Sequence, residues 1–262
     1  MKQIIIELIA YRDLLLMLTL RDIKVRYKQA SMGFLWAIFM PIVAVSAGIL
    51  IKKTLAVASQ TSLDMEKSIF SLAVKVLPWT FFVSSIRFAV QSLVGNSSLV
   101  TKIYFPRAVL PLSAILACLF DFALAAGVLA VILTFMNVGI SIHILWLPVL
   151  LLFLLLFICG TGILLSAINL FFRDIKYIVE VILMFGIFFT PVFYPAEAIG
   201  RWKNLLLLNP VGSLLEAINA VVVMHRQPDL GWVAYAAFCS IILFWFGLVT
   251  FKKKEPYFVE NI

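Results

Sequence analysis

Few residues of this chain have the types and spacing that a catalytic or metal site needs. The three cysteines, Cys118, Cys159 and Cys239, are widely spaced inside apolar runs, so we interpret them as buried hydrophobic side chains rather than as disulfide or zinc ligands. The two histidines, His143 and His225, could bind a metal together, but single interfacial histidines are the simpler interpretation. No Ser/His/Asp or Cys/His arrangement is visible. The sequence therefore predicts no catalytic residue and no metal site.

A nucleotide-binding loop is also missing from the sequence. No G-x-x-x-x-G-K-[ST] pattern is present, so the chain has no loop of this type to hold the phosphates of ATP. The weak glycine fragment Gly160-Thr161-Gly162 lies inside an apolar run without a preceding strand. We interpret its glycines as points where two helices approach closely. No cofactor is expected in this chain.

Ionisable residues inside the apolar runs are rare. Asp121 lies near the middle of one run, where an unpaired carboxylate is costly, so we expect it to face a cavity or a partner. A proton-coupling role for Asp121 is the alternative. Arg87 lies near the end of another run and can extend its guanidinium toward the interface. Secondary transporters usually combine such carboxylates with broken helices in two matching halves, and no matching halves are visible here.

Composition defines the class of protein in which these residues must be positioned. Of 262 residues, 64% are hydrophobic and 13% are charged, against about 45–50% and about 25% in soluble domains. The mean hydropathy is +1.11. These values exclude ordinary soluble enzymes, disordered chains and small disulfide scaffolds, and they predict an all-α integral membrane protein. The net charge of +8 is therefore assigned to membrane orientation and not to nucleic-acid binding.

Six apolar runs have about the 20 residues that a membrane-spanning helix needs. They cover residues 33–51, 68–92, 108–135, 144–172, 175–194 and 232–251, and they define a transmembrane domain over 32–262. A further apolar stretch, 205–224, is interrupted by Asn209-Pro210 into pieces too short to span. The sequence therefore predicts a polytopic protein with six transmembrane helices and re-entrant outer helices between spans five and six.

The distribution of Lys and Arg predicts that both termini are cytoplasmic. In that orientation the inner segments hold most of the 21 basic residues, namely Lys2, Arg12, Arg21, Lys24, Arg26, Lys28, Lys102, Arg107, Arg173, Lys176, Lys252, Lys253 and Lys254. The outer segments hold Lys52, Lys53, Lys67, Arg201, Lys203 and Arg226.

Residues 1–31 are expected to form a cytoplasmic interface segment. Glu7, Arg12 and Asp13 interrupt its apolar residues, which argues against a signal peptide or a span and favours an amphipathic helix at the membrane interface. The following stretch, 21–28, is strongly basic. It serves either to attract anionic lipid or to dock a cytoplasmic partner.

Several segments together resemble one family. They read RDIKVRYKQ (21–29), GFLW (33–36) with Pro41, LPWTFF (77–82), NSSLVTKIYFPR (96–107), TPVFYP (190–195), LNPV (208–211) and FKKKEPYF (251–258). In this order they resemble type-2 ATP-binding-cassette exporter permeases. The most similar group exports lipid-linked polysaccharides: O-antigen, capsule and teichoic acid.

The resemblance implies a transport subunit and not an enzyme. Such permeases lie in the bacterial cytoplasmic membrane as homodimers, together with two copies of a separate cytoplasmic ATPase that carries ATP and Mg. Their partners are the lipid-linked polysaccharide and membrane lipids, with no nucleic acid. A small-molecule or drug exporter on the same scaffold is the alternative. An intramembrane enzyme of lipid-sugar metabolism would need paired carboxylates or a metal cluster, which the sequence lacks.

The resemblance also assigns candidate site residues. ATPase coupling is expected from Lys24, Arg26, Lys28, Asn96, Ser98, Thr101, Lys102 and Arg107. The substrate path is expected along the aromatic residues Trp79, Phe81, Phe82, Phe185, Phe188, Phe189, Phe193 and Tyr194, because flat rings can stack on sugar faces. The outer gate is expected at Pro191, Pro195, Glu197, Pro210 and Glu216. Lys52, Lys53 and Lys75 are additional outer charges that contact either an anionic cargo or lipid headgroups.

Overall fold

The computed structural model describes residues 7, 9–28, 65–136, 138–139 and 141–260, together with isolated positions between 35 and 50. Within these residues the structure is helical and contains no strand, as predicted. Its elements are α2 (Arg12–Lys28), α4 (Met65–Gly95), α5 (Ser97–Lys102), α6 (Val109–Phe135), η1 (Ile142–Trp146), α7 (Leu147–Phe171), α8 (Ile175–Gly186), η2 (Ala196–Trp202), α9 (Lys203–Leu207), α10 (Pro210–Val222), α11 (Leu230–Lys254) and η3 (Glu255–Tyr257).

Four helical stretches are long and apolar enough to cross a membrane. They are Lys67–Gly95, Val109–Phe135, Ile142–Phe171 and Leu230–Tyr257. They match the predicted spans 68–92, 108–135, 144–172 and 232–251, because long apolar runs satisfy their backbone hydrogen bonds only as helices when no water is present. Most of the predicted span 33–51 lies outside the described residues.

The prediction of one continuous helix over 175–194 is wrong. Helix α8 has only 12 residues and ends at Gly186, and turns follow. Pro191 has no backbone N–H and disfavours a helical conformation in the residue before it, so the helix cannot continue through this point. Thr190 instead accepts a 2.7 Å backbone hydrogen bond from Val192. Twelve helical residues rise roughly 18 Å, which is less than the hydrocarbon thickness of about 30 Å.

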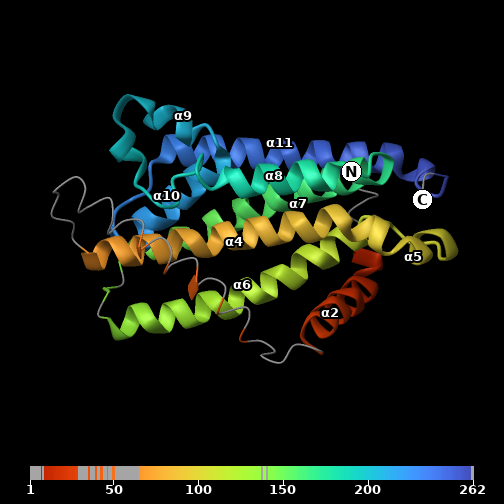
Figure 1. Cartoon of the computed structure of the whole chain (residues 1–262), viewed down its shortest axis with the longest axis horizontal. Helices are drawn as coiled ribbons and strands as arrows, with labels where there is room; N and C mark the ends of the chain where they lie inside the picture. Colours follow the sequence, from red (N-terminus) through yellow and green to blue (C-terminus); the bar gives the residue numbers. More distant parts are fainter. Residues whose placement is uncertain are drawn as a thin grey trace.

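The predicted break in the apolar stretch 205–224 is confirmed. Helix α9 ends at Leu207 and α10 begins at Pro210. Proline is suited to the first helical position, where no N–H is needed, and the Asn209 side chain caps the helix by accepting a 3.1 Å hydrogen bond from the N–H of Val211. Both helices are too short to span a membrane. They lie at the same end of the bundle (Figure 1).

The long helices form a bundle around α4. Helices α4, α6, α7, α8 and α11 run along the long axis, while α5 and the C-terminus lie at the end opposite to α9 and α10 (Figure 1). The most apolar part of α4 is 61% buried, against 22% for α6, 22% for η1 with α7, and 28% for α11. Helix α4 packs on both α6 and α7, and α7 packs on α11. The outer helices therefore keep broad apolar faces for lipid or for another chain.

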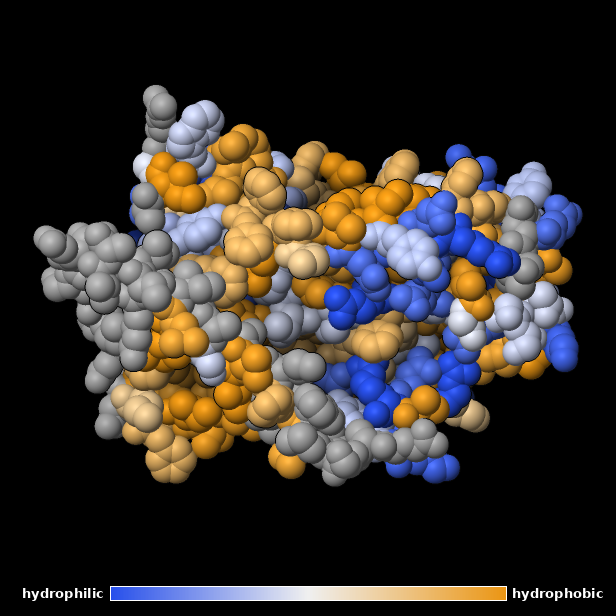
Figure 2. Space-filling model, viewed as in Figure 1, coloured by the Kyte–Doolittle hydropathy of each residue, from blue (hydrophilic) through white to orange (hydrophobic). Residues whose placement is uncertain are grey.

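Helix α2 packs obliquely on α6 near the α5 end of the bundle (Figure 1). The predicted N-terminal helix is thus present over 12–28, but its faces are not separated into apolar and charged sides. Leu16, Met17 and Leu20 are exposed beside charged residues. The inner face carries charge as well, because Asp22 accepts a 3.3 Å hydrogen bond from Ser113 of α6. Figure 2 shows hydrophilic side chains gathered toward this end of the molecule.

Candidate functional site

A cavity of about 620 Å³ lies between α4, α7 and α8. Its wall is almost entirely apolar and includes aromatic rings from helices far apart in the sequence. The aromatic lining residues are Trp79, Phe82, Phe157, Phe185 and Phe189. The structure thus brings four predicted path residues, two from α4 and two from the α8 region, around one space. Phe157 of α7 was not predicted, because apolar periodicity alone does not separate it from its neighbours.

The rings form a buried inner wall and an exposed outer wall. Trp79 is only 5% exposed and lies with its ring centroid 5.4 Å from that of Phe82, which in turn is 6.2 Å from Phe157. In contrast, Phe185 is 52% exposed and Phe189 is 72% exposed. Exposed rings of this kind can stack on an apolar face of a passing ligand without holding it by charge.

The other predicted path residues lie outside this cavity. Phe81 is buried and stacks on Phe122 of α6 at 4.9 Å, because consecutive helical positions point about 100° apart and Phe81 therefore leaves the face that Trp79 and Phe82 share. Phe188 and Phe193 pair with each other at 6.5 Å. The hydroxyl of Tyr194 donates a 2.6 Å hydrogen bond to the carbonyl oxygen of Phe188.

The predicted gate region is tied to α4 by a buried lysine. Lys75 is 1% exposed, and its Nζ lies 3.2 Å from Glu216 Oε1 and 3.1 Å from the carbonyl oxygen of Tyr194. The same Glu216 oxygen accepts a 2.9 Å hydrogen bond from the backbone N–H of Ala196. Lys75 therefore contacts neither cargo nor lipid, contrary to expectation, because a buried ammonium needs a local counter-charge.

Prolines and polar side chains hold the remaining gate segments together. Asn209 donates a 2.9 Å hydrogen bond to Thr190, next to Pro191. Pro195 is exposed and directly precedes η2. Glu197 forms ion pairs with Lys203 and Arg226 at 3.4 and 3.5 Å. Partial burial alone would raise the pKa of Glu197, but a backbone hydrogen bond and the two cations lower it below the ordinary value.

Asp121 is paired within the chain. Its carboxylate accepts hydrogen bonds from Arg26 and Tyr27 of α2, and the Arg26 guanidinium lies 4.3 Å from the centre of the Phe88 ring. Burial and the hydrogen bond to Asp121 raise the pKa of Tyr27. Sequence reasoning missed this cluster, because its members lie on α2, α4 and α6 and no short spacing connects them. Arg87 is exposed on α4.

Some of the predicted coupling residues are hydrogen-bonded to other segments of the chain, and the others are exposed. Asn96 accepts a 3.0 Å hydrogen bond from Arg21, and Arg107 donates a 2.6 Å hydrogen bond to the carbonyl oxygen of Glu255. These contacts connect the segment 96–107, which contains α5, to α2 and to the C-terminal end of the chain. The exposed members are Lys24, Lys28, Ser98, Thr101 and Lys102. Tyr104, which is 93% exposed in the same segment, was not predicted.

Comparison with known proteins places these features in a family context. Residues 13–223 match the family model described as ABC-2 type transporter. The chain is 30% identical over 269 residues to the O-antigen export system permease protein RfbA of Myxococcus xanthus, with 100% of both chains covered. It is 28% identical over 250 residues to the O-antigen export system permease protein RfbA of Klebsiella pneumoniae, covering 95% of this chain and 94% of that protein.

Proposed function

The chain belongs to the ABC-2 type transporter family, and from this premise we propose that it is the permease subunit of an ATP-driven exporter of lipid-linked polysaccharide. The cargo is of the O-antigen, capsule or teichoic acid type. Full-length similarity to permeases named for O-antigen export supports this cargo over the small molecules of a drug exporter. The chain is a transport subunit and not an enzyme.

The aromatic cavity is the observation that carries the proposal. A polymer of many sugar units must slide past the protein, so its path needs weak and repeated contacts instead of one deep site. Phe185 and Phe189 offer exposed rings beside the buried ring of Trp79, and none of the described residues that line the cavity is charged. Such a wall lets sugar faces stack and leave again.

The proposed assembly is supported by membership of the ABC-2 type transporter family. Six spans would place both termini in the cytoplasm. They would require residues 33–51 to cross the membrane, and α8 to cross it together with the turns that follow Gly186, in addition to the four long helices. A homodimer in the bacterial cytoplasmic membrane would complete the path, and two copies of a separate ATPase would hold ATP and Mg. The exposed residues Lys24, Lys28, Ser98, Thr101 and Lys102 would contact that ATPase, while Arg26, Asn96 and Arg107 hold the docking surface in shape.

The path is tested by removing its rings. We expect the double variant Phe185→Ala/Phe189→Ala to reduce surface polysaccharide several-fold per molecule of permease, and addition of Trp79→Ala to leave lipid-linked polymer inside the cell. Each stacking contact contributes on the order of 1 kcal/mol to the interaction between ring and sugar, and this contribution is lost with the ring. ATP hydrolysis by the partner should continue. Surface polysaccharide and membrane abundance of the permease are measured together.

A matched control separates path rings from lipid-facing rings. Phe135 and Phe238 are 82% and 64% exposed but do not line the cavity. Phe135→Ala/Phe238→Ala should leave export unchanged. Normal export by the Trp79→Ala/Phe185→Ala/Phe189→Ala variant at normal abundance would show that the cavity is not part of the substrate path.

A further inference from the structure

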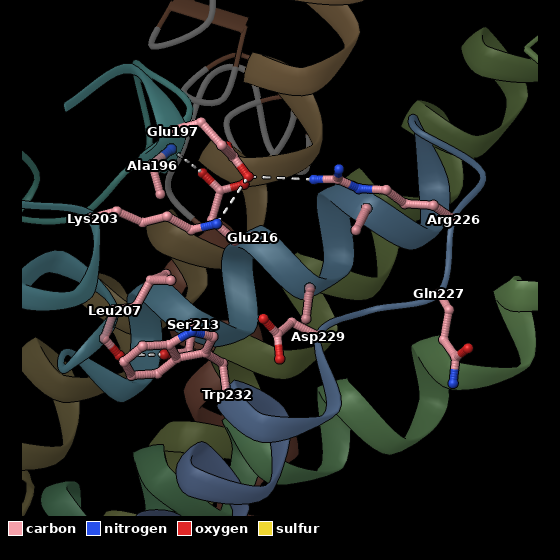
Figure 3. A pocket seen from close by; sticks show the side chains of 12 residues that line it. Ala196, Glu197, Lys203, Leu207, Ser213, Glu216, Arg226, Gln227, Asp229 and Trp232 are labelled. Atoms are coloured by element: carbon pink, nitrogen blue, oxygen red, sulfur yellow. Dashed lines mark hydrogen bonds and ion pairs between the residues drawn. The ribbon is translucent and has the colours of Figure 1, made fainter. Parts of the chain in front are cut away.

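A second pocket of about 210 Å³ lies beside the Lys75–Glu216 pair, at the end of the bundle that holds α9 and α10. Unlike the aromatic cavity, it is lined by several charged side chains, together with Trp232 and small or aliphatic residues. Figure 3 shows Glu197, Lys203 and Arg226 converging from separate segments, with Asp229 and Trp232 on the opposite side. Its volume is below the range of about 300–1,000 Å³ that is usual for drug-sized ligands, so it suits a single small ring.

Among the lining residues that the structure describes, the charges of this pocket balance one another. Lys203 and Arg226 both pair with Glu197, and Asp229 supplies a second carboxylate. Glu216, which also lines the pocket, is neutralised by the buried Lys75. An anionic ligand such as a phosphate or an acidic sugar therefore gains little net attraction. A neutral ligand with several hydroxyl groups would meet both donors and acceptors.

Hydrogen-bonding capacity remains after these pairs have formed. A guanidinium carries five N–H donors, and the contact of Arg226 with Glu197 uses only part of them. One oxygen of Asp229 caps α11 by accepting a 3.0 Å hydrogen bond from the N–H of Gly231. Among the described residues no hydrogen bond is found to its other oxygen, which is therefore free to accept one from a ligand.

The aromatic wall of the pocket is held in a fixed orientation. Trp232 is half-buried and packs edge-to-face on Tyr235, with ring centroids 5.9 Å apart. The Tyr235 hydroxyl donates a 2.9 Å hydrogen bond to the carbonyl oxygen of Leu208, which ties this pair of rings to the segment between α9 and α10. A ring fixed in this way can offer a flat apolar face at little entropic cost.

We propose that this polar pocket, between η2, α9, α10 and the start of α11, binds one neutral sugar unit of the exported polymer. The proposal rests on the proposed function and adds a specific subsite to it. A sugar ring has a flat apolar face for Trp232 and peripheral hydroxyl groups for Arg226, Asp229 and Glu197. The subsite lies beside the turns of the predicted gate, so an occupied pocket would hold a sugar unit at the exit of the path.

Binding is tested on the full-length permease in complex with its ATPase, reconstituted in nanodiscs. The probes are neutral oligosaccharides released by mild acid from the surface polysaccharide of the same strain, with inorganic phosphate and a hexuronic acid as anionic comparators. We expect the neutral probes to bind, and Trp232→Ala to weaken their affinity about fivefold, as expected for a lost stacking contact. Arg226→Gln should weaken it as well.

The controls keep structural damage apart from loss of the subsite. Trp232→Phe retains an aromatic face and should restore most of the affinity. Trp245→Ala removes a 49% exposed tryptophan from the same helix, away from the pocket, and should change nothing. Membrane abundance is measured for every variant.

Two outcomes would contradict the proposed sugar-binding subsite but would leave the proposed export function unaffected. One is that Trp232→Ala binds the neutral oligosaccharides as tightly as the unchanged protein. The other is that phosphate or the hexuronic acid binds to the unchanged protein more tightly than the neutral oligosaccharides do. By contrast, normal surface polysaccharide in a strain from which the permease has been deleted would overturn the proposed function.

Discussion

At the scale of single residues, two charged groups inside the bundle are held by specific counter-charges. Lys75 pairs with Glu216, and Asp121 pairs with Arg26. Removing an ion from water costs several kcal/mol, which close pairing offsets in part, so each pair stabilises one arrangement of its helices. Two donors on Asp121 favour a structural role over proton coupling.

The Arg26–Asp121 pair predicts a measurable coupling. Asp121→Ala and Arg26→Ala should each lower the thermal midpoint of the detergent-solubilised protein. Each variant loses a hydrogen bond between charged groups, which contributes about 1.5–3 kcal/mol to stability, and leaves the other partner without its counter-charge. The double variant should lose less stability than the sum of the two single losses, since it leaves neither partner as an unpaired charge. Arg87→Ala, at an exposed position of α4, is the control and should have little effect. Strictly additive losses would contradict the pairing.

At the scale of elements, glycines set the distance between helices. A Cβ atom on Gly160 of α7 would lie 2.6 Å from the backbone nitrogen of Phe244 in α11, and one on Gly247 would lie 2.5 Å from the carbonyl oxygen of Gly160. A Cβ on Gly162 would lie 3.0 Å from the Cβ of Ala89 in α4. The interpretation of Gly160 and Gly162 as helix-packing residues is thus confirmed.

These contacts predict which glycine substitutions separate α7 from α11. Gly160→Ala should lower the thermal midpoint and the membrane abundance, because an extra carbon atom at a close backbone contact costs about 1–3 kcal/mol. Gly127→Ala is the matched control, since no atom lies within 4 Å of its added Cβ. Equal stability of the two variants, measured by the same unfolding assay, would show that α7 and α11 are not in this contact.

At the scale of the whole molecule, α4 connects the end proposed to dock the ATPase with the end proposed to form the outer gate. Its 31 residues rise roughly 46 Å. Lys75 anchors the gate segments near one end, Trp79 lines the aromatic cavity, and the helix ends beside Asn96, where α2 and α5 meet. We propose that this long and buried helix transmits a displacement of the proposed docking surface toward the proposed gate.

Cysteine substitutions test which side of the membrane each end occupies. Ser98→Cys and Thr101→Cys should crosslink to the ATPase and should not react with a membrane-impermeant maleimide added to intact cells. Asn204→Cys, at the opposite end of the bundle, should react from outside. Reaction of Ser98→Cys from outside would reverse the proposed topology and exclude α5 as the docking element. Native Cys118 is buried, and Cys159 and Cys239 are replaced by serine as a background control.

Local sequence signals were sufficient for the class of fold and for many of its elements. Four spans, the α-helical class and the break at Asn209-Pro210 depend on consecutive apolar residues and on the missing N–H of proline, which act on neighbouring residues only. Pro191 carries the same signal, but the predicted span 175–194 extends across it because most surrounding residues are apolar, whereas α8 ends at Gly186.

The sequence by itself determined that this chain is helical, apolar enough for a membrane and equipped with two groups of aromatic residues. Only the tertiary structure decided that Trp79 faces the rings after α8 while Phe81 faces α6, and that Lys75 and Asp121 are paired. The physical reason is that hydrophobic runs specify where helices form, whereas the rotation of each helix about its axis is set by contacts with residues far away in the chain.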